Sequence, residues 1–382
     1  MKRGSRRKIA FFVLVAGLVL LFRPAGAHMR AASLLTRFST PDDHGMVASF
    51  GAHEVLERAF VVKGPRGDVP ARVYAPKDLP GAPGIVLVHG VHHTGIDEPR
   101  LMRFARTISA TGVVVLTPEI EELRDYHVDP ASIDTVGAAA RALRGEVHAE
   151  TVGVMGLSFG GGLSLLAAAD PRFQPDIGFV VAVGAHDDLQ RVSHFFATND
   201  IRDPDGRPQP IKAHEYGAMV LVYSHIEDFF AADDVPVARE ALRAWLWEDR
   251  DAARAKLPSL GDAGREKMSR LFAGNVGSIA PEILAELGKR AAEADRVSPH
   301  GHLKALRVPV YLLHGAGDTV IPASETLWLA RDVPAGLARD VLVSPAIQHV
   351  ELEGEPTLGD KWALVHFMAD VLAQAERAPR SG

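Results

Sequence analysis

The stretch TVGVMGLSFGGG, residues 151–162, decides the fold that this sequence predicts. Its first half is strand-like, and the glycines after Ser158 open a helix. Between them lies Gly156-Leu157-Ser158-Phe159-Gly160, a match to G-x-S-x-G. In that motif the serine occupies a tight strand-to-helix turn, where the residues two before and two after crowd each other and must be small. Since the strand and helix patterns flank the motif as it requires, Ser158 is predicted to be a nucleophile.

Strand and helix patterns alternate on both sides of this stretch. The apolar runs at 84–89 and 113–116 are typical of strands buried on both faces, and apolar spacing predicts helices at 99–110 and 129–144. The other expected elements are strands at 59–63, 69–75, 151–157, 177–183, 310–313 and 340–343, and helices at 160–169 and 361–374. This alternation predicts an α/β fold with a mainly parallel, doubly wound sheet, whose active site lies at the carboxyl ends of the strands.

The alternation stops between residues 187 and 306. This stretch is rich in Ala, Arg and Glu, and its apolar spacing predicts helices at 237–256 and 281–294. We therefore expect 187–306 to be a helical cap inserted into a core made of residues 59–186 and 307–376.

Composition narrows the function classes. The chain has 382 residues, 47% of them hydrophobic and 24% charged, as in ordinary globular proteins. A formal net charge of -6 without a concentrated basic stripe argues against a nucleic-acid partner. The lack of cysteine excludes disulfides, thiolate metal sites and a cysteine nucleophile. No carboxylates stand at ligand spacing beside His92 and His93, so these are expected to be loop residues, and no metal or cofactor is predicted.

The N-terminus has the three parts of an export signal. Residues 1–8 are strongly basic, residues 9–22 are apolar, and Ala25-Gly26-Ala27 is a small-x-small site. As a helix the apolar run spans about 21 Å, less than the ~30 Å bilayer core, which favours a cleaved signal over a membrane anchor at 1–27. In both cases the rest of the chain is exported, to the periplasm or the medium, or is held outside the cytoplasm by residues 9–22. Residues 28–58 are then a tether or a first helix.

A serine hydroxyl needs a base, which an acid orients. In chains with the G-x-S-x-G elbow the acid and then the histidine follow the serine. Asp318 ends a glycine-containing turn after the strand at 310–313, and His349 lies in the loop after the strand at 340–343. Both residues are therefore expected at the same sheet edge as Ser158.

These features together resemble the α/β-hydrolase superfamily, in its serine esterase and lipase-like form, from about Ala59 to Leu372. The matching pieces are His89-Gly90, the Ser158 elbow, the segment from His314-Gly315 to Asp318 with Val320-Ile321-Pro322 after it, and His349-Val350-Glu351. The resemblance implies that Ser158 is the nucleophile, Asp318 the acid and His349 the base.

The sequence leaves two parts of the site open: the second oxyanion donor and the acid. The backbone N–H groups of Phe159 and Val91 are the expected oxyanion donors, although Val91-His92-His93-Thr94-Gly95 departs from the triple-glycine form of some lipases. Asp187 is the alternative acid, because some hydrolases of this fold take their acid from that position. His186, His300, His302 and His314 are expected to be structural or surface residues, and Trp245 and Trp247 packing residues.

The predicted reaction is hydrolysis of a carboxylic ester of small or medium size through an acyl-enzyme intermediate. Two alternatives stay open. The same triad serves acyltransferases and peptidases, and a non-catalytic binding protein can retain the fold. The sequence predicts no oligomeric state.

Overall fold

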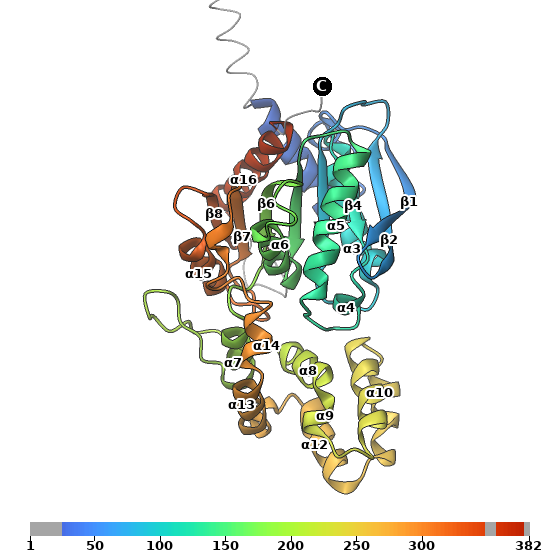
Figure 1. Cartoon of the computed structure of the whole chain (residues 1–382), viewed down its shortest axis with the longest axis vertical. Helices are drawn as coiled ribbons and strands as arrows, with labels where there is room; N and C mark the ends of the chain where they lie inside the picture. The colour runs from blue at the N-terminus through green and yellow to red at the C-terminus, as the bar shows by residue number, and fades with distance from the viewer. Residues whose placement is uncertain (1–24, 348–356, 378–382) are drawn as a thin grey trace, which may run out of the picture.

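The computed structural model describes residues 25–347 and 357–377 and contains an eight-stranded sheet of order β1-β2-β4-β3-β5-β6-β7-β8 (Figure 1). The hairpin of β1 (Val55–Gly64) and β2 (Gly67–Pro76) is antiparallel and pairs antiparallel with β4. The other strands pair in parallel: β3 (Gly84–Val88), β4 (Val114–Pro118), β5 (Val152–Leu157), β6 (Ile177–Val183), β7 (Val310–Gly315) and β8 (Ala338–Ser344). The mainly parallel α/β sheet expected from the sequence is thereby confirmed.

Helices cover both faces of the sheet. The central strands are apolar on both faces and need cover on each. In β3, for example, alternate residues enter two separate clusters of buried apolar side chains. Val86 and Val88 join a cluster with α5 (Ala131–Glu146) and α6 (Phe159–Ala169), whereas Ile85 and Leu87 join a cluster on the opposite face. That second cluster includes α3 (Pro99–Ala110), α16 (Leu358–Glu376) and a helix at residues 25–39. Two-sided burial explains the continuous apolar runs of the central strands.

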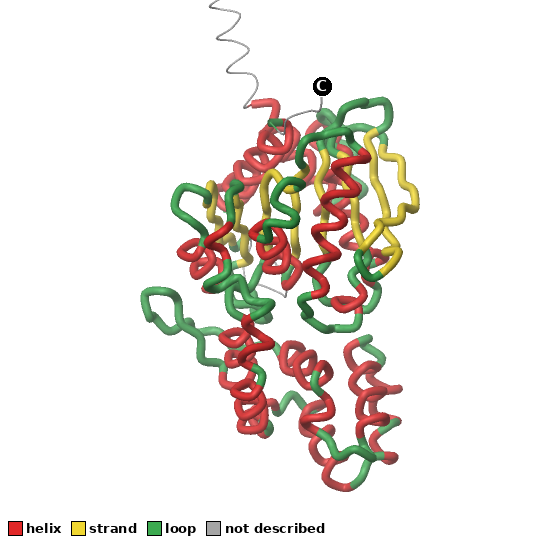
Figure 2. Tube along the Cα trace, viewed as in Figure 1, coloured by secondary structure: helices red, strands yellow, loops and turns green. Residues whose placement is uncertain are grey.

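The stretch between β6 and β7 is helical, and we refer to residues 187–306 as the cap segment, after the cap that the sequence predicts there. Figure 2 shows the strands gathered in one part of the molecule and the cap helices beyond one end of the sheet. The helices are α7 (Leu189–Thr198), α8 (Glu215–Ser224), α9 (Ile226–Phe229), α10 (Val235–Leu246), α11 (Arg250–Ala255), α12 (Asp262–Phe272), α13 (Ala280–Lys289) and α14 (Ala291–Asp295). Their apolar faces share one buried cluster with the α5 and α6 side of the sheet.

Both cap helices expected from the sequence are interrupted. The expected helix at 237–256 is two helices, α10 and α11, because Glu248 adopts a left-handed conformation (φ 64°). The Asp249 side chain then caps the new helix by accepting a hydrogen bond from the Ala252 N–H. The expected helix at 281–294 divides at Arg290 into α13 and α14. Apolar spacing continued across both breaks, so periodicity alone predicted one helix in each place.

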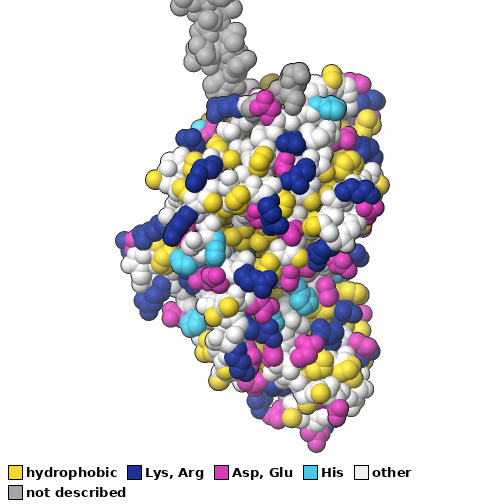
Figure 3. All heavy atoms as spheres, viewed as in Figure 1, with side chains coloured by type: hydrophobic (Ala, Val, Ile, Leu, Met, Phe, Trp, Pro, Cys, Tyr) yellow, Lys and Arg dark blue, Asp and Glu magenta, His cyan; other side chains and the backbone are white. Residues whose placement is uncertain are grey.

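Residues 28–58 contain most of a first helix, which loops follow, and β1 begins within the range at Val55. This helix runs from 25 to 39. Its residues Ala27, Ala31 and Leu34 are buried in the second apolar cluster, the one that contains Ile85 and Leu87 of β3. The apolar segment 9–22 lies outside the described residues. Within the described ranges no helix is both long and apolar enough to cross a bilayer. On the face drawn in Figure 3, basic and acidic side chains are interspersed rather than gathered by sign.

Candidate active site

Ser158 lies at a strand-to-helix elbow, as expected. It follows β5 directly, precedes the first residue of α6, and has φ 54° and ψ −130°. A non-glycine residue rarely adopts positive φ, at a cost of about 1–3 kcal/mol, and such strain gathers at active sites. The Ser158 N–H donates to the Val183 carbonyl at 2.8 Å, which fixes the turn to the end of β6. The side chain is half-buried at the carboxyl edge of the sheet.

The elbow leaves no room for a side chain at residue 156. A Cβ atom there would stand 2.2 Å from the carbonyl oxygen of Gly160. We expect Gly156→Ala to lower the free energy of unfolding by about 2 kcal/mol or more, because backbone must move to relieve the overlap. Denaturant unfolding measures this loss. Gly145→Ala in α5 is the matched control, since its Cβ would meet nothing within 4 Å. Equal stability of the two variants would contradict the steric account of the elbow.

Asp318 follows β7 and is nearly fully buried. Its Oδ1 accepts hydrogen bonds from the N–H groups of Val320 at 2.9 Å and Ile321 at 3.0 Å. Its Oδ2 lies 3.6 Å from where a Cβ on Gly184 would stand, so the carboxylate reaches the residue that follows the end of β6. Because Ser158 also bonds to Val183 at the end of β6, the nucleophile candidate after β5 and the acid candidate after β7 both contact the end of the strand between them.

His314 supports the turn that holds Asp318, so its structural interpretation fits the contacts. Its Nε2 lies 2.8 Å from the Ile321 carbonyl oxygen and its Nδ1 2.7 Å from the Thr326 hydroxyl. Since the carbonyl only accepts, Nε2 carries the proton and Nδ1 accepts from the hydroxyl. The same Nε2 stands 3.5 Å from Oδ2 of Asp318.

His349, the expected base, lies outside the described residues. The last described residue before it, Ile347, packs at the end of β7, where its carbonyl oxygen is 2.9 Å from the position of a Cβ on Gly315. The assignment of His349 as base stays a prediction.

Residues 90–95, which we call the oxyanion loop, pass beside the nucleophile. A Cβ on Gly90 would stand 3.6 Å from Oγ of Ser158. Within the described chain the Val91 N–H donates to no hydrogen bond. The Phe159 N–H belongs to the first residue of α6, where the helix offers no acceptor. Neither of the two N–H groups expected to hold an oxyanion therefore donates a hydrogen bond within residues 25–347 and 357–377.

His89, at the end of β3, orients this loop, a role that the sequence did not reveal. Its Nδ1–H donates to the Gly90 carbonyl at 2.7 Å, and its Nε2 accepts from the Ile120 N–H at 3.0 Å. Because the peptide is trans, holding the Gly90 carbonyl on one side directs the Val91 N–H to the other. Burial lowers the pKa of His89 to about 4, so the ring stays neutral and keeps this tautomer above pH 5.

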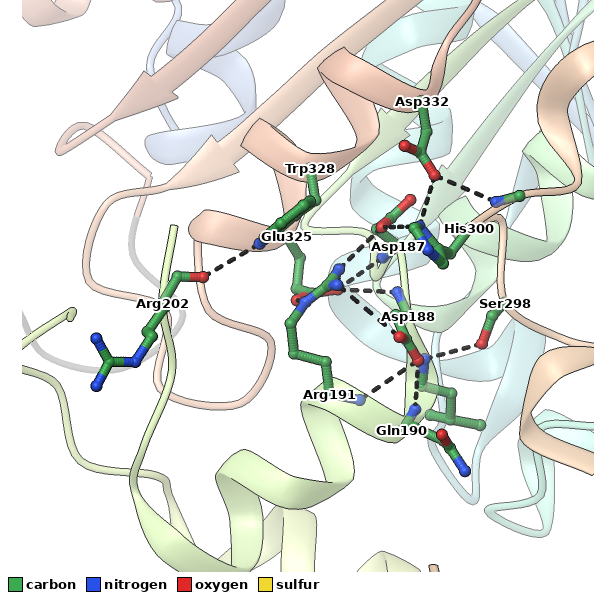
Figure 4. Close-up of polar contacts among 12 residues, drawn as sticks. Asp187, Asp188, Gln190, Arg191, Arg202, Ser298, His300, Glu325, Trp328 and Asp332 are labelled. Carbon is green, nitrogen blue, oxygen red and sulfur yellow. Dashed lines mark hydrogen bonds and ion pairs between the residues drawn. The ribbon is translucent and has the colours of Figure 1, made fainter. Parts of the chain in front are cut away.

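Asp187, the alternative acid, takes part in an ion-pair network where the chain leaves the core for the cap (Figure 4). Its Oδ2 accepts from Arg191 at 2.8 Å, and Arg191 also pairs with the buried Glu325 at 2.6 Å. Glu325 in turn accepts from the Asp187 N–H at 2.9 Å. The Nδ1 atom of His300 lies 3.4 Å from Oδ2 of Asp187 and 2.7 Å from Oδ2 of Asp332.

This network, which we call the junction network, ties together both crossings between core and cap. Asp187 and Arg191 lie on the outgoing crossing, His300 on the returning one, and Glu325 and Asp332 on α15 (Ser324–Asp332) of the core. The atoms of Asp187, His300 and Asp332 are close enough to hold a cation. The guanidinium on Asp187 supplies positive charge there instead, so we assign the cluster a structural role.

Burial, with the nearby Glu325 carboxylate, raises the pKa of Asp187 to about 7, well above its ordinary value. Between those two values the folded protein binds more protons than the unfolded chain, so this residue's contribution to stability is lost as pH rises toward 7. We expect the stability of wild type relative to Asp187→Asn to fall by up to about 2 kcal/mol from pH 5 to pH 8. Urea unfolding at both pH values measures this, with exposed Asp262→Asn as control. A pH-independent difference for Asp187→Asn would refute it.

A mostly apolar cavity lies between the core and the cap segment, next to the elbow. It is lined by Phe159 and Tyr126 from the core and by apolar side chains of α7, α8, α9 and α13, among them Phe196, Val220, Phe229 and Ile283. Polar groups, including His225 and Arg290, line another part of it. Trp245 packs against Phe272 and away from this lining, in agreement with a packing role.

No family model matches the chain. A curated relative, the pimeloyl-[acyl-carrier protein] methyl ester esterase of Aromatoleum aromaticum, is 28% identical over 273 residues, which are 70% of this chain and 94% of that protein. A solved structure from Legionella pneumophila, assigned to the hydrolases, aligns with a TM-score of 0.52 at 13% identity, over 92% of this chain and 96% of its own.

The acylaminoacyl peptidase of Pyrococcus horikoshii aligns with a TM-score of 0.47 at 12% identity, over 89% of this chain. This chain spans 44% of that peptidase, so it corresponds to less than half of the larger protein. Taken with the sheet order, the similarity to the Legionella structure shows a common fold, and the similarity to the curated esterase supports a hydrolase enzyme.

Proposed function

We propose that this chain, which has the α/β-hydrolase fold, is a serine hydrolase that cleaves a carboxylic ester through an acyl-enzyme intermediate. One observation carries the proposal: a serine with positive φ stands at a strand-to-helix elbow beside two N–H groups that donate no hydrogen bond in the part of the chain that the structure describes. A packing residue gains nothing from backbone strain, whereas a nucleophile needs the exposure that the elbow gives its hydroxyl.

In the proposed reaction the Ser158 hydroxyl attacks the ester carbonyl while His349 takes its proton. The N–H groups of Val91 and Phe159 donate to the oxyanion that forms. His349 then protonates the leaving alcohol, and water attacks the acyl-enzyme with the same base. Asp318 holds the imidazole in the tautomer that can accept the serine proton.

Two observations support Asp318 over Asp187 as the acid. Asp318 follows β7, the strand next to β6, and reaches Gly184, close to the Val183 carbonyl that anchors Ser158. Asp187 is committed to Arg191 and the junction network. A carboxylate already paired with a guanidinium is a poor partner for an imidazole, because its charge is largely compensated.

The cavity between core and cap supports an ester with an apolar group of medium size. Phe159, the residue after the nucleophile, forms part of its wall, and most of the remaining lining is apolar. Such a cavity binds a ligand by burying apolar surface, with a few polar groups fixing its orientation. The curated relative is named for a methyl ester, which belongs to the ester class that we propose here.

Labelling and turnover together test the proposal. An alkyl fluorophosphonate should modify Ser158, identified by peptide mass spectrometry, and p-nitrophenyl esters of two to eight acyl carbons should be hydrolysed. Absence of labelling in folded protein would reject a nucleophilic serine and favour the binding-protein alternative. Labelling with peptide cleavage, or with acyl transfer to an added alcohol, and no ester hydrolysis would replace the esterase assignment by the peptidase or acyltransferase alternative.

We also propose that the chain is exported, or held outside the cytoplasm by residues 9–22. The basic start and the apolar run support this, and the burial of Ala27 inside helix 25–39 favours retention of the segment, because cleavage after Ala27 would remove the first turn of a packed helix. Mass spectrometry of the N-terminus of the protein from fractionated cells tests both parts. Recovery of the whole population in the cytoplasm would reject export.

A further inference from the structure

The carbonyl groups of residues 90–93, the first part of the oxyanion loop, are each held by a hydrogen bond. Three of the donors belong to the core: His89 donates to the Gly90 carbonyl, the Gly95 N–H to that of His92 at 2.9 Å, and Arg124 to that of His93 at 3.0 Å. The fourth donor comes from the cap segment. The hydroxyl of Tyr216, on α8, donates to the Val91 carbonyl at 3.1 Å.

The start of α8 also contacts the turn that holds the acid candidate. The His214 N–H donates to the carbonyl of Thr319, the residue after Asp318, at 2.8 Å. His214 caps the helix, because its ring accepts from the Tyr216 N–H at 3.1 Å. One helix end is therefore bonded to the oxyanion loop and to the acid turn at once.

Tyr216 is suited to hold its partner in place. Its ring packs edge-on against Tyr126, with centroids 6.3 Å apart, and burial raises its pKa above the usual value, so the hydroxyl stays protonated as a donor. A second cap contact braces the same loop, since the His93 ring stacks on Trp247 with centroids 5.1 Å apart.

We propose that Tyr216 is a positioning residue. Its hydroxyl holds the Val91 carbonyl, which belongs to the peptide after the one that bears the Val91 N–H, and so restrains residue 91 with its N–H aimed at the oxyanion. This inference rests on the proposed serine-hydrolase function. Oxyanion donors act by being oriented before charge develops, so a loop free to reorient loses rate and not substrate affinity. Through this hydrogen bond the cap segment would act on catalysis directly, in addition to lining the cavity.

Tyr216→Phe removes the hydroxyl and keeps the ring packing. Since one neutral hydrogen bond is worth roughly a 3- to 10-fold change in rate, we expect kcat on p-nitrophenyl butyrate to fall by about that factor with KM within twofold. The affinity for an alkyl trifluoromethyl ketone, which forms a tetrahedral adduct with an oxyanion, should fall by the same factor. Replacement of Tyr216 by 4-aminophenylalanine, which retains a donor, should restore both values.

Tyr223→Phe is the matched control on the same helix. Its hydroxyl donates to Asp125 at 2.7 Å and accepts from Arg243 at 3.0 Å, away from the oxyanion loop. We expect its kcat and ketone affinity to equal those of wild type, with melting temperatures of all variants recorded in parallel.

An unchanged kcat and ketone affinity in Tyr216→Phe would overturn the inference, as would a change confined to KM, which would mean that the hydroxyl contacts the substrate. If Tyr216→Phe does not fold, failure of the folded 4-aminophenylalanine variant to retain wild-type kcat overturns it as well. These results are distinct from failure of the proposed function, which would show as wild-type protein without fluorophosphonate labelling or turnover.

Discussion

Ser158→Ala is expected to lower kcat for p-nitrophenyl butyrate by about 10⁴-fold or more, with fluorophosphonate labelling abolished. The substitution removes the only atom that can form the acyl-enzyme, and loss of a serine nucleophile elsewhere costs up to about 10⁶-fold. The remaining activity reflects binding and the oxyanion donors, which survive the change. Stopped assays over hours, with enzyme at micromolar concentration, are needed to measure so slow a variant.

The variant should fold as wild type does. Alanine keeps the Cβ that packs beside Gly90 and pays the same cost as serine for a φ of 54°. Ser269→Ala, at an exposed site on cap helix α12, controls for loss of a serine hydroxyl. If Ser158→Ala kept more than a hundredth of wild-type turnover, the acyl-enzyme mechanism would be wrong.

The sequence was sufficient for the parts of the site that local chain geometry dictates. The elbow needs small residues at 156 and 160 and a strand and a helix on either side, all within a dozen residues of Ser158. The expected sheet follows from the same kind of information, because β3 to β7 are apolar on both faces and end in short loops. The position of Asp318 after β7 follows from that strand.

The sequence could not predict what depends on distant contacts. Tyr216 and Val91 are 125 residues apart in the chain, and Arg191 and Glu325 are 134 apart. No local pattern marks such pairs, because each residue type is common in helices for other reasons. His89 was expected only as part of a motif, and its two hydrogen bonds, to Gly90 and Ile120, emerge from the packing of β3 against the chain after β4.

The break between α10 and α11 was missed for a related reason. A single left-handed residue, Glu248, ends α10, and glutamate is a helix former that gives no warning of this. The N-cap at Asp249 was a possible signal, since aspartate is favoured there, but aspartate is also common on exposed helix faces.

The second large loss of activity is expected when the acid of the proposed triad is replaced. Asp318→Asn is expected to lower kcat by about 10⁴-fold, because an amide in this position favours the wrong imidazole tautomer and cannot stabilise the imidazolium. The turn should survive, since the amide oxygen can still accept from the N–H groups of Val320 and Ile321. The change therefore separates the charge of Asp318 from its part in the fold.

Asp187→Asn distinguishes the two candidates. Its carboxylate contacts Arg191 and His300 in the junction network, so its loss should change stability with pH while kcat stays within about tenfold of wild type. Measuring kcat for both variants at pH 8, with circular dichroism to verify folding, gives a clear reading. A large loss in Asp187→Asn beside a small one in Asp318→Asn would transfer the acid to the end of β6 and require His349 to approach from that strand. A large loss in Asp318→Asn beside a small one in Asp187→Asn would keep the acid at the end of β7, where the N–H groups of Val320 and Ile321 hold the carboxylate in place.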